Sequence, residues 1–254
     1  MSNYRFPDGA AIVFGGSGGL GTGVVELLGD CGVNVAFTYL TNEEAANNNL
    51  ENLTKKGVEG MIGKVDLLNL ETTTSFANEA KKKFKRIHSV IFATGPFLHI
   101  LPIMEANPED VYSTLDTDIK GFYHVIKATI PLLREGGGGS LTALTTAAIH
   151  KYISTDGLSS VPKAGVKHLC TAIAREEGEH GIRANCVAVG LIAVGLSQEI
   201  ESPPGGILDQ WMQQVPLNRP GAPEELSDVV VFLASENAGY ISGQSLPVDG
   251  GYSA

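Results

Sequence analysis

GGSGGLG at residues 15–21 follows the apolar run Ala10–Phe14 and opens a helical pattern that continues to about Asp30. A glycine-rich turn between a strand and a helix lets the backbone approach a pyrophosphate, and the helix N-terminus adds free N–H groups and a favourable dipole. The simpler interpretation is a tight glycine turn without a ligand. We predict a strand–turn–helix unit that binds a dinucleotide.

Strand-like and helix-like segments alternate along the rest of the chain. Short apolar runs predict strands at Ala10–Phe14, Asn34–Tyr39, Met61–Val65, Val90–Ala93, Leu141–Leu144, Arg183–Val189 and Ser245–Val248. Helical patterns cover Gly19–Asp30, Thr41–Lys56, Thr72–Phe84, Pro108–Leu133, Val161–His180 and Glu224–Ala234. Uniformly apolar strands that alternate with helices indicate a parallel sheet covered on both faces. We expect an α/β fold with a Rossmann-type doubly wound parallel sheet of about seven strands in three layers, formed by residues 1–254 as a single domain.

Composition and charge exclude several classes of partner. The chain has 254 residues, 43% hydrophobic content and a net charge of −10, with a mean hydropathy of +0.07. Nucleic-acid surfaces need clustered Lys and Arg, and we interpret the basic run at residues 81–86 as a solvated helix end. No apolar run reaches the ~18 residues of a membrane helix, and no signal sequence is evident. We expect a cytoplasmic protein that binds neither nucleic acid nor membrane.

The cysteines do not indicate a metal site. Cys31, Cys170 and Cys186 are too few for a disulfide scaffold and lack metal-ligand spacing. Each lies in an apolar stretch, so we interpret them as small buried residues. We predict that the chain binds no metal.

Two segments interrupt the regular alternation. The four glycines within Glu135–Ser140 predict a flexible turn, and Gly195–Pro223 is long, rich in Pro and Gly and weakly periodic. Long loops in compact domains are usually functional, and this one follows the carboxyl end of a strand, where open parallel sheets bind ligands. We predict a substrate lid at about 195–216. The segments Gly95–Met104 and Gly195–Pro216 are apolar, which favours a hydrophobic small-molecule substrate.

Further motifs extend the pattern of the glycine loop. Together with Gly15-x-x-x-Gly19-x-Gly21, the runs at residues 65–67 (VDL), 92–95 (FATG), 183–192, 218–221 and 241–251 resemble the short-chain dehydrogenase/reductase family over essentially the whole chain. The resemblance implies a Rossmann fold and a nicotinamide cofactor. By this resemblance the cofactor-binding residues are Gly15, Ser17, Gly18, Gly19, Leu20, Gly21, Tyr39, Thr41, Asp66, Leu67, Ala93, Thr94, Gly95, Lys163, Gly190 and Ile192.

The choice between NAD and NADP depends on the end of the second strand. An acidic residue there would bind the adenosine ribose and repel a 2′-phosphate, but the spacing from Gly21 places Tyr39 at that position. No Arg or Lys lies just after Tyr39, so a 2′-phosphate would depend on Thr41, Asn42 and backbone N–H groups. We favour NADP, with NAD possible.

The active site that the resemblance implies is altered. The family's reductases use an asparagine, a serine, a tyrosine and a lysine, and spacing places these at Asp118, Thr146, Ser159 and Lys163. In the family, tyrosine protonates the substrate oxygen, lysine holds the cofactor ribose, serine binds the substrate oxygen and asparagine anchors a relay water. Only the lysine is retained here, and Thr146 keeps a hydroxyl. Asp118 would form an ion pair with Lys163 through water.

Ser159 is the most consequential change. A serine hydroxyl is a much weaker acid than a phenol, so it is a poor proton donor for ketone reduction. Reduction of a conjugated C=C leaves an enolate that the hydroxyls of Thr146 and Ser159 could stabilise. The 2,4-dienoyl-CoA reductases of the family resemble this chain in lacking that tyrosine. Some of them use a tyrosine after the fifth strand, where this chain has Ala148, with Tyr152 four residues later.

Several alternatives stay open. Ser159 could instead be the N-cap of a helix that carries Pro162 in its first turn. The chain could be a binding or regulatory protein that has lost hydride chemistry, since Val194 also departs from the family's threonine. It could also be a lyase or isomerase that uses Asp118 or His150 as base. By resemblance we expect a homo-tetramer or homo-dimer, paired through the helices at Pro108–Leu133 and Val161–His180.

Overall fold

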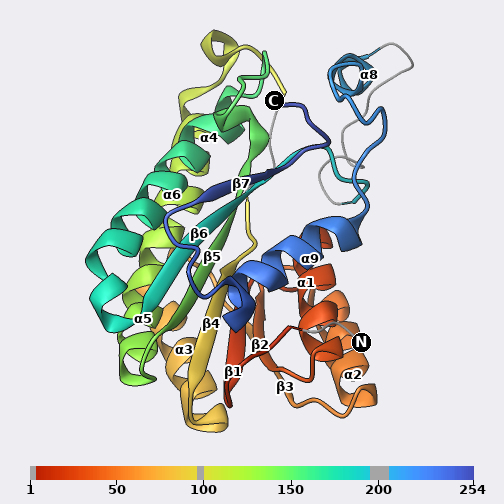
Figure 1. Cartoon of the computed structure of the whole chain (residues 1–254). Helices are drawn as coiled ribbons and strands as arrows, with labels where there is room; N and C mark the ends of the chain where they lie inside the picture. The colour runs from red at the N-terminus through yellow and green to blue at the C-terminus, as the bar shows by residue number, and fades with distance from the viewer. Residues whose placement is uncertain (1–3, 96–99, 195–205) are drawn as a thin grey trace.

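All strands of the described chain belong to one sheet. The computed structural model describes residues 4–95, 100–194 and 206–254. The strands are β1 (Ala10–Phe14), β2 (Asn34–Tyr39), β3 (Gly60–Lys64), β4 (Ile87–Phe92), β5 (Gly139–Thr146), β6 (Ile182–Val189) and β7 (Ser245–Val248). They form a seven-stranded sheet in the order β3-β2-β1-β4-β5-β6-β7, and every pair is parallel. The predicted doubly wound α/β sheet is confirmed (Figure 1).

Helices cover both faces of the sheet, which makes three layers. They are α1 (Gly19–Asp30), α2 (Glu43–Lys55), α3 (Leu70–Phe84), α4 (Pro108–Leu115), α5 (Gly121–Glu135), α6 (Gly157–Glu176), α8 (Ile207–Met212) and α9 (Pro223–Ala234). Side chains of α3, α5 and α6 share one apolar cluster with the sheet. Those of α1, α2 and α9 share the other, and Figure 1 shows the two groups on opposite sides. This double cover explains why the central strands are apolar on both faces.

Two predicted helices differ in their bounds. The pattern at Pro108–Leu133 predicts one helix, but the turns at Asp116–Lys120 are π-helical and separate α4 from α5. Short π-helical insertions inside α-helices are frequent at functional sites. The helix predicted at Val161–His180 begins earlier, at Gly157, and ends at Glu176. Pro162 therefore lies beyond its first turn.

Two of the three cysteines are buried, as the sequence predicts, and none of the described helices suits a membrane. Cys170 and Cys186 are buried and Cys31 is half-buried, and none of them forms a disulfide with another described residue. Across the described ranges, no helix combines the length and apolar character needed to cross a bilayer.

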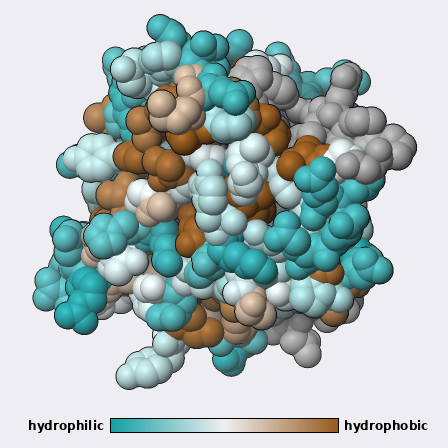
Figure 2. All heavy atoms as spheres, turned by 90° about the horizontal axis from the view of Figure 1, so that it is seen from above, coloured by the Kyte–Doolittle hydropathy of each residue, from teal (hydrophilic) through white to brown (hydrophobic). Residues whose placement is uncertain are grey.

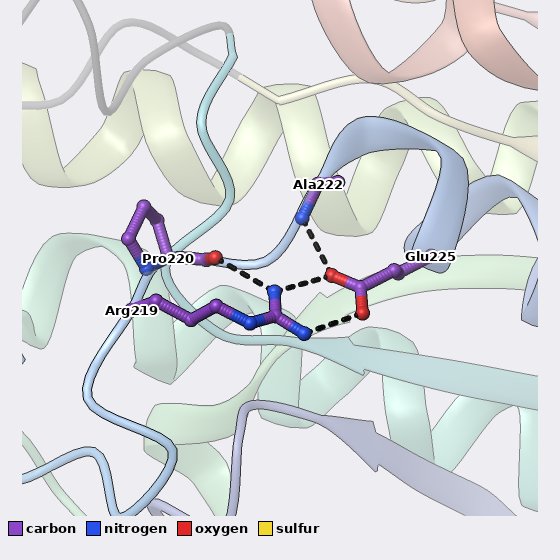
Figure 3. A network of polar contacts seen from close by, with 4 residues as sticks. All are labelled: Arg219, Pro220, Ala222 and Glu225. Carbon is purple, nitrogen blue, oxygen red and sulfur yellow. Dashed lines mark hydrogen bonds and ion pairs between the residues drawn. The ribbon is translucent and has the colours of Figure 1, made fainter.

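A bidentate ion pair fixes the segment that enters α9. Both terminal nitrogens of Arg219 donate to the Glu225 carboxylate at 2.7 Å, and the Ala222 N–H donates to Oε2 of Glu225 at 2.8 Å (Figure 3). Glu225 therefore caps the N-terminus of α9 and holds Arg219 at the same time. Next to it, the Gly221 N–H donates to the carbonyl of Leu191 at 2.9 Å, so this network also positions the chain that leaves β6.

We predict that Glu225→Gln lowers the thermal midpoint at pH 7. The Arg219 guanidinium and the Ala222 N–H hold the pKa of Glu225 at about 2, below its ordinary value of 4.5. The stabilisation is therefore present above pH 4.5 and is lost as the pH falls through about 2. Thermal unfolding of both proteins across this pH range should show a difference that disappears at the acid end. A difference independent of pH would contradict the electrostatic explanation.

Candidate active site

The glycine loop is held from behind by side chains of β2 and α2. The N–H of Gly15 donates to Oγ1 of Thr38 at 3.0 Å, and Nδ2 of Asn49 donates to the carbonyl of Gly16 at 2.9 Å. Gly15 has a φ of +86°, which L side chains rarely adopt. A Cβ on Gly21 would overlap the carbonyl oxygen of Gly15. The close turn at residues 15–21 thus requires glycine at two positions.

The front of this loop is open. Gly18 and Gly19 are exposed, while Ser17 and Leu20 are half-buried. Gly18 is the N-cap of α1 and provides no side-chain cap. The first N–H groups of α1 therefore point to an open surface, as a helix N-terminus that receives a pyrophosphate requires.

The residues predicted for the adenosine end lie at the ends of β2 and β3. Tyr39 and Lys64 are register partners, and Thr41 and Asp66 are exposed beyond them. Oδ1 of Asp66 accepts the N–H of Leu68 at 2.9 Å. Leu67 is half-buried, and its carbonyl contacts Nδ1 of His124 at 2.7 Å.

Tyr39 has an acidic neighbour, Glu43, which the spacing from Gly21 does not indicate. Burial raises the pKa of Tyr39, and a hydrogen bond with the Glu43 carboxylate raises it further. Glu43 is the first residue of α2. A carboxylate thus lies next to Tyr39, the position predicted to contact the adenosine ribose, although the residue at that position is not acidic.

The turn after β4 lies beside the glycine loop. The N–H of Ala93 donates to the carbonyl of Phe14 at 2.9 Å, and a Cβ on Gly15 would lie 2.6 Å from Cγ2 of Thr94. Oγ1 of Thr94 is buried, and no hydrogen-bond partner for it occurs among the described residues. An unpaired buried hydroxyl at this position fits a site that receives a polar group of a dinucleotide.

Lys163 is the centre of the predicted catalytic group. Its ammonium lies 2.8 Å from Oδ1 of Asp118, donates to the carbonyl of Thr94 at 2.8 Å and lies over the ring of Phe92, 5.3 Å from its centroid. Gly95 follows, and a Cβ there would be 3.7 Å from the ammonium. The side chain of Lys163 is only 11% exposed, and its ammonium is held between Asp118 and the carboxyl end of β4.

Asp118 contacts Lys163 directly. The sequence predicts an ion pair through water, and this detail is wrong, because the two side chains meet at hydrogen-bonding distance. Asp118 is fully buried in the π-helical turn. Burial raises the pKa of Asp118, and the ammonium of Lys163 offsets part of that rise. A buried carboxylate is costly unless it is paired, and Lys163 is the cation beside this one.

Thr146 and Ser159 lie at the entry to α6. Thr146 ends β5, and its Oγ1 accepts the N–H of Ala148 at 3.2 Å, which leaves its own proton for a ligand. Ser159 is buried in the first turn of α6, whose N-cap is Asp156. The alternative of Ser159 as N-cap is therefore wrong. The hydroxyl of Ser159 lowers in part the pKa of the Asp156 carboxyl group, which burial raises.

A pocket opens at the carboxyl ends of β5 and β6. Its atom-free volume, mouth included, is about 470 Å³, and Figure 2 shows apolar side chains gathered in the middle of this end of the molecule. Thr146, Asp156, Gly190, Trp211 and Tyr252 contribute to its wall. Of these, the sequence singled out only Thr146 and Gly190. Asp156 lies three residues before Ser159, and this short spacing is the sequence feature that could have identified it as a site residue.

Other predicted residues lie apart from this pocket. Ile192 is buried and bridges Gly221. Ala148 is buried, and Tyr152 is 59% exposed. Nε2 of His150 contacts Oγ of Ser245 at 2.9 Å. The described loop therefore does not bring Tyr152 back toward Ser159.

Two predicted segments are described only in part. Residues 195–205 of the predicted lid and residues 96–99 of the predicted pocket wall lie outside the described residues. Within 206–216, α8 places Trp211 against the pocket. No cluster of metal-binding side chains occurs in the residues that the structure describes.

Comparison with known proteins agrees with this geometry. A family model described as enoyl-(acyl carrier protein) reductase matches residues 15–253. The chain is 30% identical over 243 residues to a 3-oxoacyl-(acyl-carrier-protein) reductase of Chlamydia muridarum, covering 95% of this chain and 96% of that protein. A similar reductase of Staphylococcus epidermidis is 29% identical over 249 residues, covering 95% of this chain and 98% of that protein.

A solved structure gives the same result at the level of the fold. A short-chain type dehydrogenase/reductase from Mycobacterium ulcerans superposes with a TM-score of 0.91 and 28% identity, covering 98% of this chain and 91% of that chain. Together with the sheet order and the glycine loop, these matches place the chain in the short-chain dehydrogenase/reductase family, as an oxidoreductase of the NAD(P)-dependent type.

Proposed function

We propose that this protein is an NAD(P)H-dependent reductase of a conjugated C=C bond, in an enone or enoyl thioester, or of a reactive carbonyl. The observation that carries the proposal is the buried ammonium of Lys163, held by Asp118 and by Thr94, which lies beside Gly15 of the glycine loop. A charge fixed there can hold the ribose of a dinucleotide whose pyrophosphate lies at α1. The unpaired hydroxyl of Thr94 supports the same placement.

A reduced nicotinamide, when bound, supplies a hydride. The chain's own residues then bind and orient the reactants. The loop at residues 15–21 binds the pyrophosphate through backbone N–H groups. Thr146, which has a free proton, donates a hydrogen bond to the substrate oxygen as negative charge develops there.

The nature of the hydroxyls favours a conjugated substrate. With Ser159 at the tyrosine position, no phenol is predicted beside Lys163, and a serine hydroxyl is a poor acid. An enolate spreads its charge and tolerates later protonation better than an alkoxide. The enoyl-reductase family model and the 3-oxoacyl reductase relatives both support an acyl substrate. We therefore infer a hydrophobic acyl compound, consistent with the apolar wall around Trp211.

Assembly and domain organisation complete the proposal. We propose one domain over residues 1–254, with a lid at about 195–216, and a homo-tetramer or homo-dimer paired through α4–α5 and α6. Exposed Tyr112, Tyr123 and Val161 on these helices support an interface there.

One observation favours a second candidate, a binding protein without hydride chemistry. The ammonium of Lys163 already has a carboxylate and a carbonyl as partners, which would suit a purely structural role. The lyase or isomerase alternative has less support, because His150 contacts Ser245 and does not line the pocket.

A substrate panel separates these candidates. We expect the protein to oxidise NAD(P)H with enones or enoyl thioesters faster than with simple ketones. Ser159→Tyr should shift this preference toward ketones, because it adds a phenol one helical turn before Lys163. The measurement is the loss of NAD(P)H absorbance under each substrate. Binding of the cofactor without turnover of any substrate would favour the binding protein.

Cofactor binding should depend on Gly21 much more than on Gly178, which is exposed and lies outside the predicted site. An alanine at 21 must displace the carbonyl of Gly15, whereas a Cβ at 178 meets no atom within 4 Å. We expect Gly21→Ala to weaken binding at least about tenfold, or ~1.4 kcal/mol, and Gly178→Ala to change it less than about threefold. Nicotinamide fluorescence titration measures both. Equal affinities in the two variants would contradict the placement of the pyrophosphate.

The charges at the end of β2 should set the choice between NADP and NAD. We favour NADP because Lys64 lies beside Tyr39 on β3, while Glu43 opposes a 2′-phosphate. Exposed pairs of charges contribute about 0.2–1 kcal/mol. Lys64→Gln should therefore weaken NADPH binding by up to about fivefold, and Glu43→Gln should strengthen it, with NADH binding unchanged in both. Preference of the wild type for NADH would overturn NADP as the cofactor.

A further inference from the structure

One buried carboxyl of the pocket has no part in the function described so far. Asp156 lies at the N-cap of α6, is 8% exposed and lines the same pocket as Thr146 and Gly190. An aspartate at an N-cap normally accepts an N–H of the first helical turn. The side chain of Asp156 makes no such bond, and the hydroxyl of nearby Ser159 lowers its pKa in part.

The carbonyl of Asp156, and not its side chain, accepts hydrogen bonds from the first turn of α6. The carbonyl of Asp156 accepts the N–H of Ser159 at 3.2 Å, the N–H of Ser160 at 2.9 Å and the hydroxyl of Ser160 at 2.8 Å. The carboxyl group is therefore not needed to start the helix. It is available to a molecule in the pocket.

No cation among the described residues neutralises Asp156. The nearest lysine along α6, Lys163, pairs with Asp118. Lys151 donates to the carbonyl of Tyr252 at 3.0 Å and lies over the ring of that residue. Tyr252 is the titratable neighbour across the pocket, and both Asp156 and Asp249 raise its pKa after burial. Asp156 thus faces a phenol and a serine hydroxyl.

Burial without a cation favours the neutral acid. It raises the pKa of Asp156 to about 7, although the hydrogen bond with Ser159 lowers it in part. A carboxyl group that titrates near neutral pH suits general acid catalysis, because it is both protonated often enough and acidic enough to transfer its proton. Asp118, in contrast, has a cation at 2.8 Å and is not part of the pocket wall.

We propose that Asp156 is the proton donor of this enzyme, a role that rests on the reductase function proposed above. A reduced nicotinamide, when bound, would supply the hydride to the β-carbon of the conjugated C=C bond. The C=C electron pair would shift to join the α-carbon to the carbonyl carbon, and the carbonyl π pair would move to the oxygen, where Thr146 would stabilise the enolate. The O–H bond of Asp156 would break and its proton would go to the α-carbon, which restores the carbonyl and completes the addition of two hydrogens. The carboxylate that remains takes a proton from water at the pocket mouth. Ser159 is a positioning residue that orients the carboxyl group.

The test compares the wild type with the isosteric variant Asp156→Asn. For the wild type, kcat/KM for reduction should fall as the pH rises through about 7, because the acid form is lost. The variant should be about 10²-fold slower or worse and should lack this pH dependence. Its affinity for NAD(P)H should be unchanged. A variant with the wild-type rate and pH profile would overturn the proposal.

A second measurement needs no turnover. Difference infrared spectroscopy of the cofactor-free protein should show a protonated carboxyl band that titrates near pH 7 in the wild type and is absent from Asp156→Asn. Ser159→Ala should move the midpoint upward in both the spectrum and the rate profile, because the Ser159 hydroxyl stabilises the carboxylate. This variant leaves Asp156 intact, so it tests the proposal even if the asparagine variant folds poorly. An unchanged midpoint would contradict the assignment.

Tyr252→Phe is the matched control. Loss of the Tyr252 phenol should leave the fall of kcat/KM near pH 7 unchanged, since the proton comes from Asp156. If Tyr252→Phe, and not Asp156→Asn, removes this pH dependence of kcat/KM, then Tyr252 is the donor and the proposal is wrong. A wild type that reduces no substrate in the panel would overturn the proposed function and the donor role together. An active wild type with an unimpaired Asp156→Asn variant overturns the donor role alone.

Discussion

The contact between Lys163 and Asp118 is the constraint on which the site depends. It joins α6 to the π-helical turn before α5, and the carbonyl of Thr94 adds the end of β4 to the same ammonium. A lone buried charge of either sign would be costly, and the pair offsets part of that cost. Because the three elements belong to different parts of the chain, this contact ties the carboxyl end of β4 to the helices that cover the sheet. Oδ2 of Asp118 has no hydrogen-bond partner among the described residues.

The fold could be predicted from the sequence because its signals are local. Apolar runs gave each strand to within a few residues, and the glycine loop identified the first strand–helix unit. Helix ends were less predictable. The change from α-helix to π-helix at Asp116–Lys120 contains no glycine or proline that would predict it. It depends on packing that brings Asp118 to Lys163. The start of α6 at Gly157 also precedes its predicted position, because the N-cap Asp156 offers only weak local information.

The candidate site could be predicted only as far as the resemblance extended. Spacing along motifs indicated Lys163, Asp118 and the glycine loop, and the structure brings these into one region. Motif spacing along the sequence does not indicate contacts across the sheet. Thr38 and Asn49 support the loop from β2 and α2, and Tyr252 reaches the pocket from the C-terminal segment. A single sequence does not show which distant residues share a wall, so the pocket's acid–base groups became visible only in three dimensions.

The position of Asp156 shows how a local rule and a site can conflict. An N-cap aspartate that bonds the first turn typically stabilises a helix by about 1 kcal/mol, and this one makes no such bond. Burying the carboxyl group without a cation adds a further cost above neutral pH, because each unit of pKa shift corresponds to about 1.4 kcal/mol. Stability alone would select a capping geometry or an asparagine at this position. A residue that departs from both, within the wall of a pocket at the carboxyl edge of the sheet, is better explained by a need for its proton.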